Sequence, residues 1–243
     1  MNFKAWWYDV RHPMLFIFLA YALFAGFQSG FGVLIPFFTA LLVAGAADFL
    51  LIRYKTGGWA FPSSGLVTGS IVGLVTAYTL PLGMIAVIAL LAIASKLIAW
   101  KGRHFFNPAN FGMLLGIYFL GASTAWWGAS NLLLVLLGGL FVVSRQRRWW
   151  IVLPFFATYL LIRAIMYGDI VGAFAEIAAP AIIFFATIML IEPRTSPTRR
   201  IPQLAYGILA GALVVAFSFV PGDLHLALAV ANLSVPLLGK IFK

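Results

Sequence analysis

The residues whose side chains are best suited to chemistry lie between Lys96 and Asn110. This segment offers a cation, an imidazole, an aromatic ring and two carboxamides, supplied by Lys96, His104, Phe106, Asn107 and Asn110. Aromatic rings can pack against the flat ring system of a flavin, amides can hydrogen-bond to its pyrimidine edge, and a cation can stabilise its reduced anion. These five residues are therefore candidates for a non-covalent flavin site. The same groups would also suit a quinone head.

A structural interpretation of the same segment stays open. Asn107 precedes Pro108, and the residue before a proline is biased away from helix. Asparagine is a preferred N-cap and proline a preferred first helical residue, so capping alone would explain the pair. The segment predicts a helix that begins at Pro108 under either interpretation.

Two further polar stretches flank predicted helices. Ile191–Arg200 is either a solvated basic loop, with Ser196 or Thr198 capping the next helix, or an ion-paired turn that holds two helix ends near the first site. Pro62–Gly69 opens a helix with small hydroxyl residues, for which packing is the default interpretation because such hydroxyls often bond back to the backbone.

A separate group of ionisable residues comprises Arg163, Asp169 and Glu176. An ionisable group inside a membrane is a functional-site hypothesis. The competing interpretation is interfacial, with Arg163 pairing with Glu176 across a short turn.

Other chemistries are excluded by what the chain lacks. The three histidines, His12, His104 and His225, are too few and too scattered to provide paired haem ligands. No His, Asp and Glu cluster has metal-ligand spacing, and no nucleophile–base pair or phosphate-binding glycine loop occurs. The absence of cysteine excludes disulfides and cysteine-ligated iron–sulfur clusters. The sequence thus shows no self-contained catalytic residues, and any redox chemistry would need a bound cofactor.

Composition sets the class of protein that must position these residues. Of 243 residues, 63% are hydrophobic and 9% charged, and the mean hydropathy is +1.05. Soluble domains carry about 45–50% apolar and about 25% charged residues. The chain is therefore predicted to be an all-α polytopic membrane protein, a single integral membrane domain over residues 1–243. A soluble enzyme and a nucleic-acid-binding domain are excluded.

Loop signals divide the sequence into about ten candidate transmembrane segments. They cover residues 13–28, 31–52, 63–80, 83–100, 108–122, 131–143, 149–166, 171–190, 202–220 and 224–239. Every second boundary is basic, and only Arg163 of the sixteen Lys and Arg residues falls on the opposite side. The boundary cations are Lys4, Arg11, Arg53, Lys55, Lys96, Lys101, Arg103, Arg145, Arg147, Arg148, Arg194, Arg199, Arg200, Lys240 and Lys243. The positive-inside rule then places both termini in the cytoplasm.

Glycine spacing predicts how the helices pack. Pairs four residues apart allow close helix contact in lipid, and they occur at Gly69/Gly73, Gly112/Gly116 and Gly207/Gly211. The first and last pairs, each followed by a proline, also suggest an internal duplication of segments 63–100 and 202–239. Three shared residues are too few to claim one.

Several of these stretches, in this order, resemble the membrane subunits RnfD of the Rnf electron-transport complex and NqrB of the sodium-translocating NADH:quinone oxidoreductase. The family's polar helix entry corresponds to Ser64–Pro81, and its "FNPA" motif to Phe106–Ala109. Its "TDPxTSPT" motif corresponds to Glu192–Thr198, and its "PDGxxFAVLLANxxVPL" motif to Pro221–Leu237. A lysine at a helix end before "FNPA" corresponds to Lys96. The correspondence runs from about residue 48 to the end of the chain.

The resemblance implies a ten-helix membrane fold in the bacterial cytoplasmic membrane that holds flavin and passes electrons between partner subunits. It assigns Asn107, and less directly His104, Phe106 and Lys96, to a riboflavin site near the cytoplasmic face. His104 stands where relatives often have a further asparagine.

One departure from the family concerns a second flavin. Relatives carry a long insertion after the helix that follows "FNPA", and a threonine in it bears covalent FMN. Here the connection shrinks to Gly121–Ser130, and Gly121-Ala122-Ser123-Thr124 is not that motif. We therefore expect riboflavin or FMN bound non-covalently, no covalent FMN and no haem. A transporter or channel, and a structural or assembly subunit, are the alternatives on the same scaffold.

Overall fold

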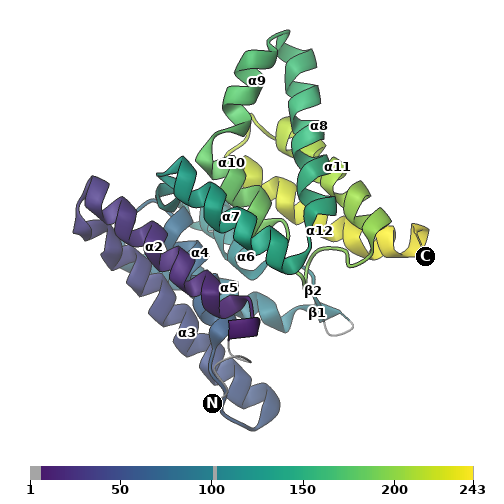
Figure 1. Cartoon of the computed structure of the whole chain (residues 1–243). Helices are drawn as coiled ribbons and strands as arrows, with labels where there is room; N and C mark the ends of the chain where they lie inside the picture. The colour runs from purple at the N-terminus through teal and green to yellow at the C-terminus, as the bar shows by residue number, and fades with distance from the viewer. Residues whose placement is uncertain (1–6, 101–102, 243) are drawn as a thin grey trace. The chain divides into compact units, whose positions relative to one another are not determined.

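The computed structural model describes residues 7–100 and 103–242, and about three quarters of them are helical (Figure 1). The chain divides into two compact units, which are described separately below. Unit 1 comprises residues 1–98 and 108–131, and unit 2 comprises residues 99–107 and 132–243. The single membrane domain over 1–243 stays a prediction. Three of the boundary cations, Lys4, Lys101 and Lys243, lie outside the described residues.

Unit 1 is built from apolar helices joined by short turns. Its elements in chain order are α2 (Arg11–Ser29), a 3-10 turn (Phe31–Val33), α3 (Leu34–Thr56), α4 (Ser63–Val75), α5 (Leu82–Ala94), a second 3-10 turn (Ser95–Leu97), α6 (Pro108–Leu120) and a third 3-10 turn (Trp127–Ala129). The start of α6 at Pro108 confirms the prediction made from the Asn107–Pro108 pair.

Unit 2 begins with a two-stranded hairpin and continues with helices. The hairpin pairs β1 (Ala99–Trp100) with β2 (Arg103–His104), and Ala99 lies opposite His104. The helices are α7 (Leu132–Gln146), α8 (Trp149–Tyr167), α9 (Ile170–Ile177), α10 (Pro180–Phe184) with a π-helical turn (Phe185–Met189), α11 (Arg200–Ala216) and α12 (Asp223–Ile241).

Four helices in the described part of the chain are long and apolar enough to cross a membrane. They are α2, α3 with its preceding turn, α8 and α12, and a fifth span results if α9 and α10, bent by 59°, count as one. The other predicted segments coincide with apolar helices of 10–17 residues. The protein is thus an all-helical membrane protein apart from its hairpin, and ten complete spans stay a prediction.

The short helix α4 shows how a buried helix end is satisfied. At 1.5 Å per residue its 13 residues extend about 20 Å, short of a hydrocarbon core of about 30 Å. Non-helical backbone at such depth needs protein partners. The loop after α6 supplies them: the Trp127 indole donates to Gly73 O at 2.8 Å, and the amides of Ala125 and Trp126 donate to Val75 O at 3.0 and 3.2 Å.

The glycine pairs lie where helices pack backbone to backbone. A Cβ added at Gly69 would meet Ala40 O at 2.5 Å, and one at Gly112 would meet Ile88 O at 2.5 Å. In unit 2, a Cβ at Gly211 would meet Phe155 O at 2.7 Å, and one at Gly207 would clash with Ile151 O. The packing interpretation of these glycines is confirmed.

The two units share an order of neighbours. In unit 1, α2 contacts α4, α3 contacts α4 and α5, and α5 contacts α6. In unit 2, α7 contacts α10, α8 contacts α9 and α11, and α11 contacts α12. By this order of contacts, α5 and α6 of unit 1 are the equivalents of α11 and α12 of unit 2. The glycine and proline pattern instead suggested α4 and α5 as the equivalents of α11 and α12, which is one helix earlier in unit 1.

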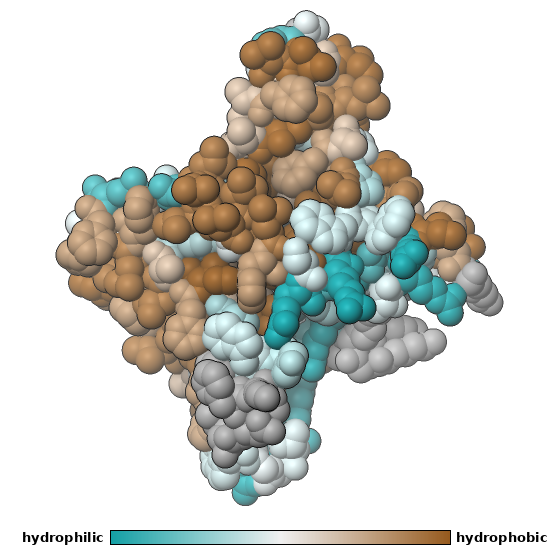
Figure 2. Space-filling view, viewed as in Figure 1, coloured by the Kyte–Doolittle hydropathy of each residue, from teal (hydrophilic) through white to brown (hydrophobic). Residues whose placement is uncertain are grey.

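Large apolar side chains cover the helix surfaces (Figure 2). Phe27, Phe119 and Ile165 are among those that are mostly exposed. A soluble protein rarely exposes so much contiguous apolar surface, whereas a lipid-facing surface requires it.

Candidate functional site

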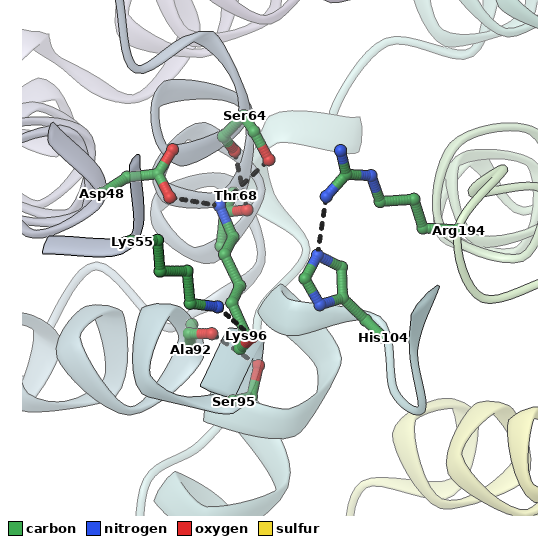
Figure 3. Close-up of polar contacts among 9 residues, drawn as sticks. All are labelled: Asp48, Lys55, Ser64, Thr68, Ala92, Ser95, Lys96, His104 and Arg194. Atoms are coloured by element: carbon green, nitrogen blue, oxygen red, sulfur yellow. Dashed lines mark hydrogen bonds and ion pairs between the residues drawn. The ribbon is translucent and has the colours of Figure 1, made fainter. Parts of the chain in front are cut away.

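Lys96 is the centre of a buried polar cluster in unit 1 (Figure 3). It lies in the 3-10 turn after α5, and its Nζ is 2.8 Å from Asp48 Oδ1 of α3. The two side chains are only 5% and 6% exposed. The ammonium also donates to Ser64 Oγ of α4 at 3.0 Å, and Lys55 donates to Lys96 O at 2.9 Å. The cluster ties α3, α4 and the end of α5 together.

Close packing of α3 on α4 explains why this pair is buried. A Cβ added at Gly65 would clash with Asp48 Cβ and approach Ala44 O to 2.8 Å. The absence of a side chain at Gly65 therefore lets α4 approach the turn of α3 that carries Asp48. The carboxylate is thereby buried, and the Lys96 ammonium is its ionic partner.

Asp48 is a residue that the sequence argument missed. It follows an apolar run in the predicted segment 31–52, and an acidic residue inside a membrane segment is a signal for a functional or paired group. That signal would have singled out Asp48, but not its partner 48 residues away.

His104 and Arg194 form the polar centre of unit 2 (Figure 3). The hairpin carries His104 at the end of β2, and Arg194 lies in the loop between the π-helical turn and α11. Arg194 Nη1 is 3.2 Å from His104 Nε2. Because a guanidinium can only donate, Nε2 is the acceptor in this contact.

Asn107 lies against the same part of unit 2. Its side-chain Nδ2 donates to Met189 O, at the end of the π-helical turn, at 3.2 Å. Between Asn107 and the hairpin, the rings of Phe105 and Phe106 have centroids 6.4 Å apart and are tilted by 42°. Unit 2 thus gathers an imidazole, a guanidinium, an amide and two aromatic rings from two segments far apart in the sequence.

The five candidates for flavin binding fall into both units. His104, Phe106 and Asn107 belong to unit 2, and Lys96 and Asn110 belong to unit 1. Asn110 is fully buried in the first turn of α6. The structure brings the first three together with Arg194, which the sequence argument placed in a neighbouring loop.

The loop Glu192–Thr198 is held by its own hydrogen bonds and by two side chains. Ser196 Oγ donates to Glu192 O at 2.7 Å, Gln203 Nε2 donates to Pro197 O at 3.2 Å, and the Arg148 guanidinium also donates to Pro197 O. Helix α11 has Arg199 as its N-cap, without a capping side-chain bond. The prediction that Ser196 or Thr198 caps α11 is therefore wrong, because the Ser196 hydroxyl bonds back into its own turn.

The outlying ionisable residues form an ion pair and a helix cap. Arg163 of α8 forms a two-pronged ion pair with Glu176 of α9, as the sequence suggested, and Tyr159 donates to the same carboxylate at 3.2 Å. Asp169 caps α9 by accepting from the amides of Val171 and Gly172 at 3.0 Å each. Within the described residues, no group of three or more His, Asp and Glu side chains is arranged to hold a metal ion.

These features define a membrane protein of packed apolar helices with a polar site at the start of unit 2. Comparison with known families matches residues 114–243 to the NQR2, RnfD, RnfE family. The match covers more than half of the chain, and the protein belongs to this family. The matched region contains Arg194 and Met189 and begins after the five candidate residues. No curated protein matches the chain.

Proposed function

We propose that the protein is an integral membrane electron-transfer subunit that binds riboflavin or FMN non-covalently and relays electrons within a multisubunit complex. Its family supports membership of a membrane electron-transport complex. The proposal places the protein in the bacterial cytoplasmic membrane with about ten spans and both termini in the cytoplasm, on the basis of its alternating basic boundaries.

The observation that carries the proposal is the meeting of two motifs in unit 2. The segment His104–Asn107 contacts the loop and helix end at Met189–Arg194, through Arg194 on His104 and Met189 O on Asn107. These motifs are more than 80 residues apart and no capping requirement joins them. Their contact assembles the aromatic, amide and cationic groups that a flavin ring needs.

The residues of unit 2 have distinct proposed roles. The ring of Phe106 packs against the flavin, and the amide of Asn107, oriented by Met189 O, binds its pyrimidine edge. Arg194 orients His104 and provides positive charge near the ring. Bound flavin would supply one- and two-electron chemistry, which no side chain of this protein provides.

We assign Lys96 an indirect role. Its ammonium already has a carboxylate and a hydroxyl partner in unit 1, so moving it to a ligand would leave Asp48 buried without a cation. Lys96 is thus proposed as a tether of the helix ends, and Asn110 as a buried polar residue in the first turn of α6.

The loop after α6 supports the proposal that no flavin is attached covalently. Thr124 pairs through its backbone with Thr76, and neighbouring residues cap α4. The segment therefore works as a helix cap. A flavin–phosphate adduct found by mass spectrometry of the denatured chain would contradict this proposal.

The test is the visible absorption spectrum of protein extracted under mild conditions. We expect flavin bands in the wild type, their loss in Asn107→Ala, and their retention in the control Asn131→Ala, which replaces an asparagine of unit 1 at the end of the α6–α7 loop. A spectrum without flavin, together with an unchanged set of copurifying subunits in Asn107→Ala, would refute flavin binding and favour an assembly subunit.

One observation favours a second function, a transporter or channel. Helices α9 and α10 meet at a 59° bend, and discontinuous helices mark substrate sites in many transporters. Solute or ion flux into liposomes without an electron donor would support this alternative. Flux that requires a donor would support the electron-transfer proposal.

A further inference from the structure

A second polar cluster lies inside unit 2, between α11 and α12. The Tyr206 hydroxyl of α11 donates to Asn232 Oδ1 of α12 at 2.8 Å. Tyr206 is 0% exposed and Asn232 is 1% exposed. Polar side chains in such positions of a membrane bundle are costly, and their hydrogen-bonding capacity needs to be satisfied.

The Tyr206–Asn232 bond leaves part of this capacity unused. Asn232 Nδ2 is buried and has no hydrogen-bond partner among the described residues. A 180° flip of the Asn232 amide would exchange its oxygen and nitrogen, but the Tyr206 hydroxyl would still bond to only one of them. Either orientation leaves one amide atom without a hydrogen bond, which costs about 1–3 kcal/mol if no water binds it.

Gln203 has an unsatisfied acceptor, whereas Asn232 has an unsatisfied donor. It lies three residues before Tyr206, so both side chains lie on the same side of α11, about 4.5 Å apart along its axis. Gln203 is 5% exposed, and its Nε2 donates to Pro197 O and Thr198 O. Its Oε1 is buried and has no hydrogen-bond partner within the part of the chain that the structure describes.

We propose that Gln203, Tyr206 and Asn232 bind internal water, forming a hydrated pocket that enters unit 2 from the basic loop. The unsatisfied Asn232 donor, the unsatisfied Gln203 acceptor and the Tyr206 hydroxyl are groups that buried water molecules bind. The Arg148 guanidinium donates to Pro197 O, which also accepts from Gln203, so a charged side chain lies at the loop end of the cluster. At 1.5 Å per residue, the pocket reaches about 9 Å beyond the start of α11.

The cysteine-free chain allows a direct test by single-cysteine labelling. Ala229 lies three residues before Asn232 on the same side of α12, whereas Ala227 is another buried alanine of α12 on a different side of the helix from Asn232; the two are 7% and 0% exposed. A thiol reacts only as the thiolate, which forms where water reaches it. The reagent is a small charged methanethiosulfonate, added to purified protein in detergent.

We expect Ala229→Cys to react more than about tenfold faster than Ala227→Cys, because each unit by which a dry site raises a thiol pKa lowers its thiolate fraction tenfold. Adding Asn232→Leu, or the milder Tyr206→Phe, should slow the Ala229→Cys reaction toward the control rate. Size-exclusion chromatography and thermal unfolding followed by tryptophan fluorescence establish that each variant is folded.

Equal rates for the two cysteines would overturn the proposal, because they would show a dry cluster. So would a rate at Ala229→Cys that neither Asn232→Leu nor Tyr206→Phe changes. Since neither the labelling rate nor the folding control uses flavin, either result leaves the proposed flavin site to its own test.

Discussion

Replacing Lys96 by methionine would leave the Asp48 carboxylate buried in unit 1 without its cation. Both side chains are about 95% buried and 2.8 Å apart, and Lys96 also holds the Ser64 hydroxyl. Removing one partner of a buried ion pair typically costs about 3–5 kcal/mol. For a protein of this size, that corresponds to a fall of about 6–20 °C in the midpoint of thermal unfolding. Asp48→Asn should lower the midpoint by a similar amount.

The double variant Asp48→Asn/Lys96→Met separates charge pairing from packing. With both charges removed, no unpaired ion is left, so we expect most of the lost stability to return. Lys55→Met is the matched control, because this exposed lysine donates only to Lys96 O, a contact worth about 1 kcal/mol. Unfolding in detergent can be followed by the fluorescence of the eight tryptophans.

The reasoning would be refuted if the double variant were destabilised by the sum of the single effects, since the charges would then not be coupled. If Lys96→Met and Asp48→Asn each lowered the unfolding midpoint as little as Lys55→Met does, burial of the ion pair would be refuted. The same variants also test the tether role of Lys96. We expect the folded double variant to retain flavin, whereas Asn107→Ala loses it.

Three further predictions concern packing, topology and pH. Gly65→Ala should destabilise unit 1 by about 1–3 kcal/mol, because its Cβ would clash with Asp48, whereas Gly83→Ala in open space should be neutral or stabilising in the same unfolding assay. In oriented vesicles, Ser144→Cys should react with an impermeant thiol reagent from the cytoplasmic side and Ser130→Cys from the opposite side; the same accessibility for both would contradict the topology. The Arg11 guanidinium donates to Asp9 and holds the pKa of that carboxyl below its ordinary value, so its contribution to stability is present above about pH 4 and is lost as the pH falls further. Asp9→Asn should therefore flatten the acid side of the stability profile, and an unchanged profile would show that the pair contributes nothing.

Local patterns were sufficient for the features that local physics determines. Hydropathy located the apolar helices, the Asn107–Pro108 pair located the start of α6, and glycine spacing located close helix contacts. Arg163 and Glu176 were paired from their proximity across a turn, because a short connection leaves few alternatives.

Features that depend on distant contacts were missed. The end of α4 at Val75 is set by amides 50 residues later in the chain, so its hydropathy alone suggested a longer helix. The partner of Lys96 lies two helices earlier, and only the glycine-mediated approach of α4 to α3 brings Asp48 into place. The site of unit 2 likewise depends on Arg194, which no periodicity connects to His104.

The interleaved order of the two units has a consequence for biosynthesis. The hairpin segment is translated before α6 completes unit 1, yet Asn107 bonds to Met189, 82 residues further on. At about 5–20 residues per second, the ribosome needs about 4–16 s to produce that partner. Throughout this interval His104 and Asn107 lack the contacts described above. Assembly of the proposed flavin site is thereby delayed until Met189 and Arg194 have been made, so we expect a nascent chain arrested before them to lack flavin.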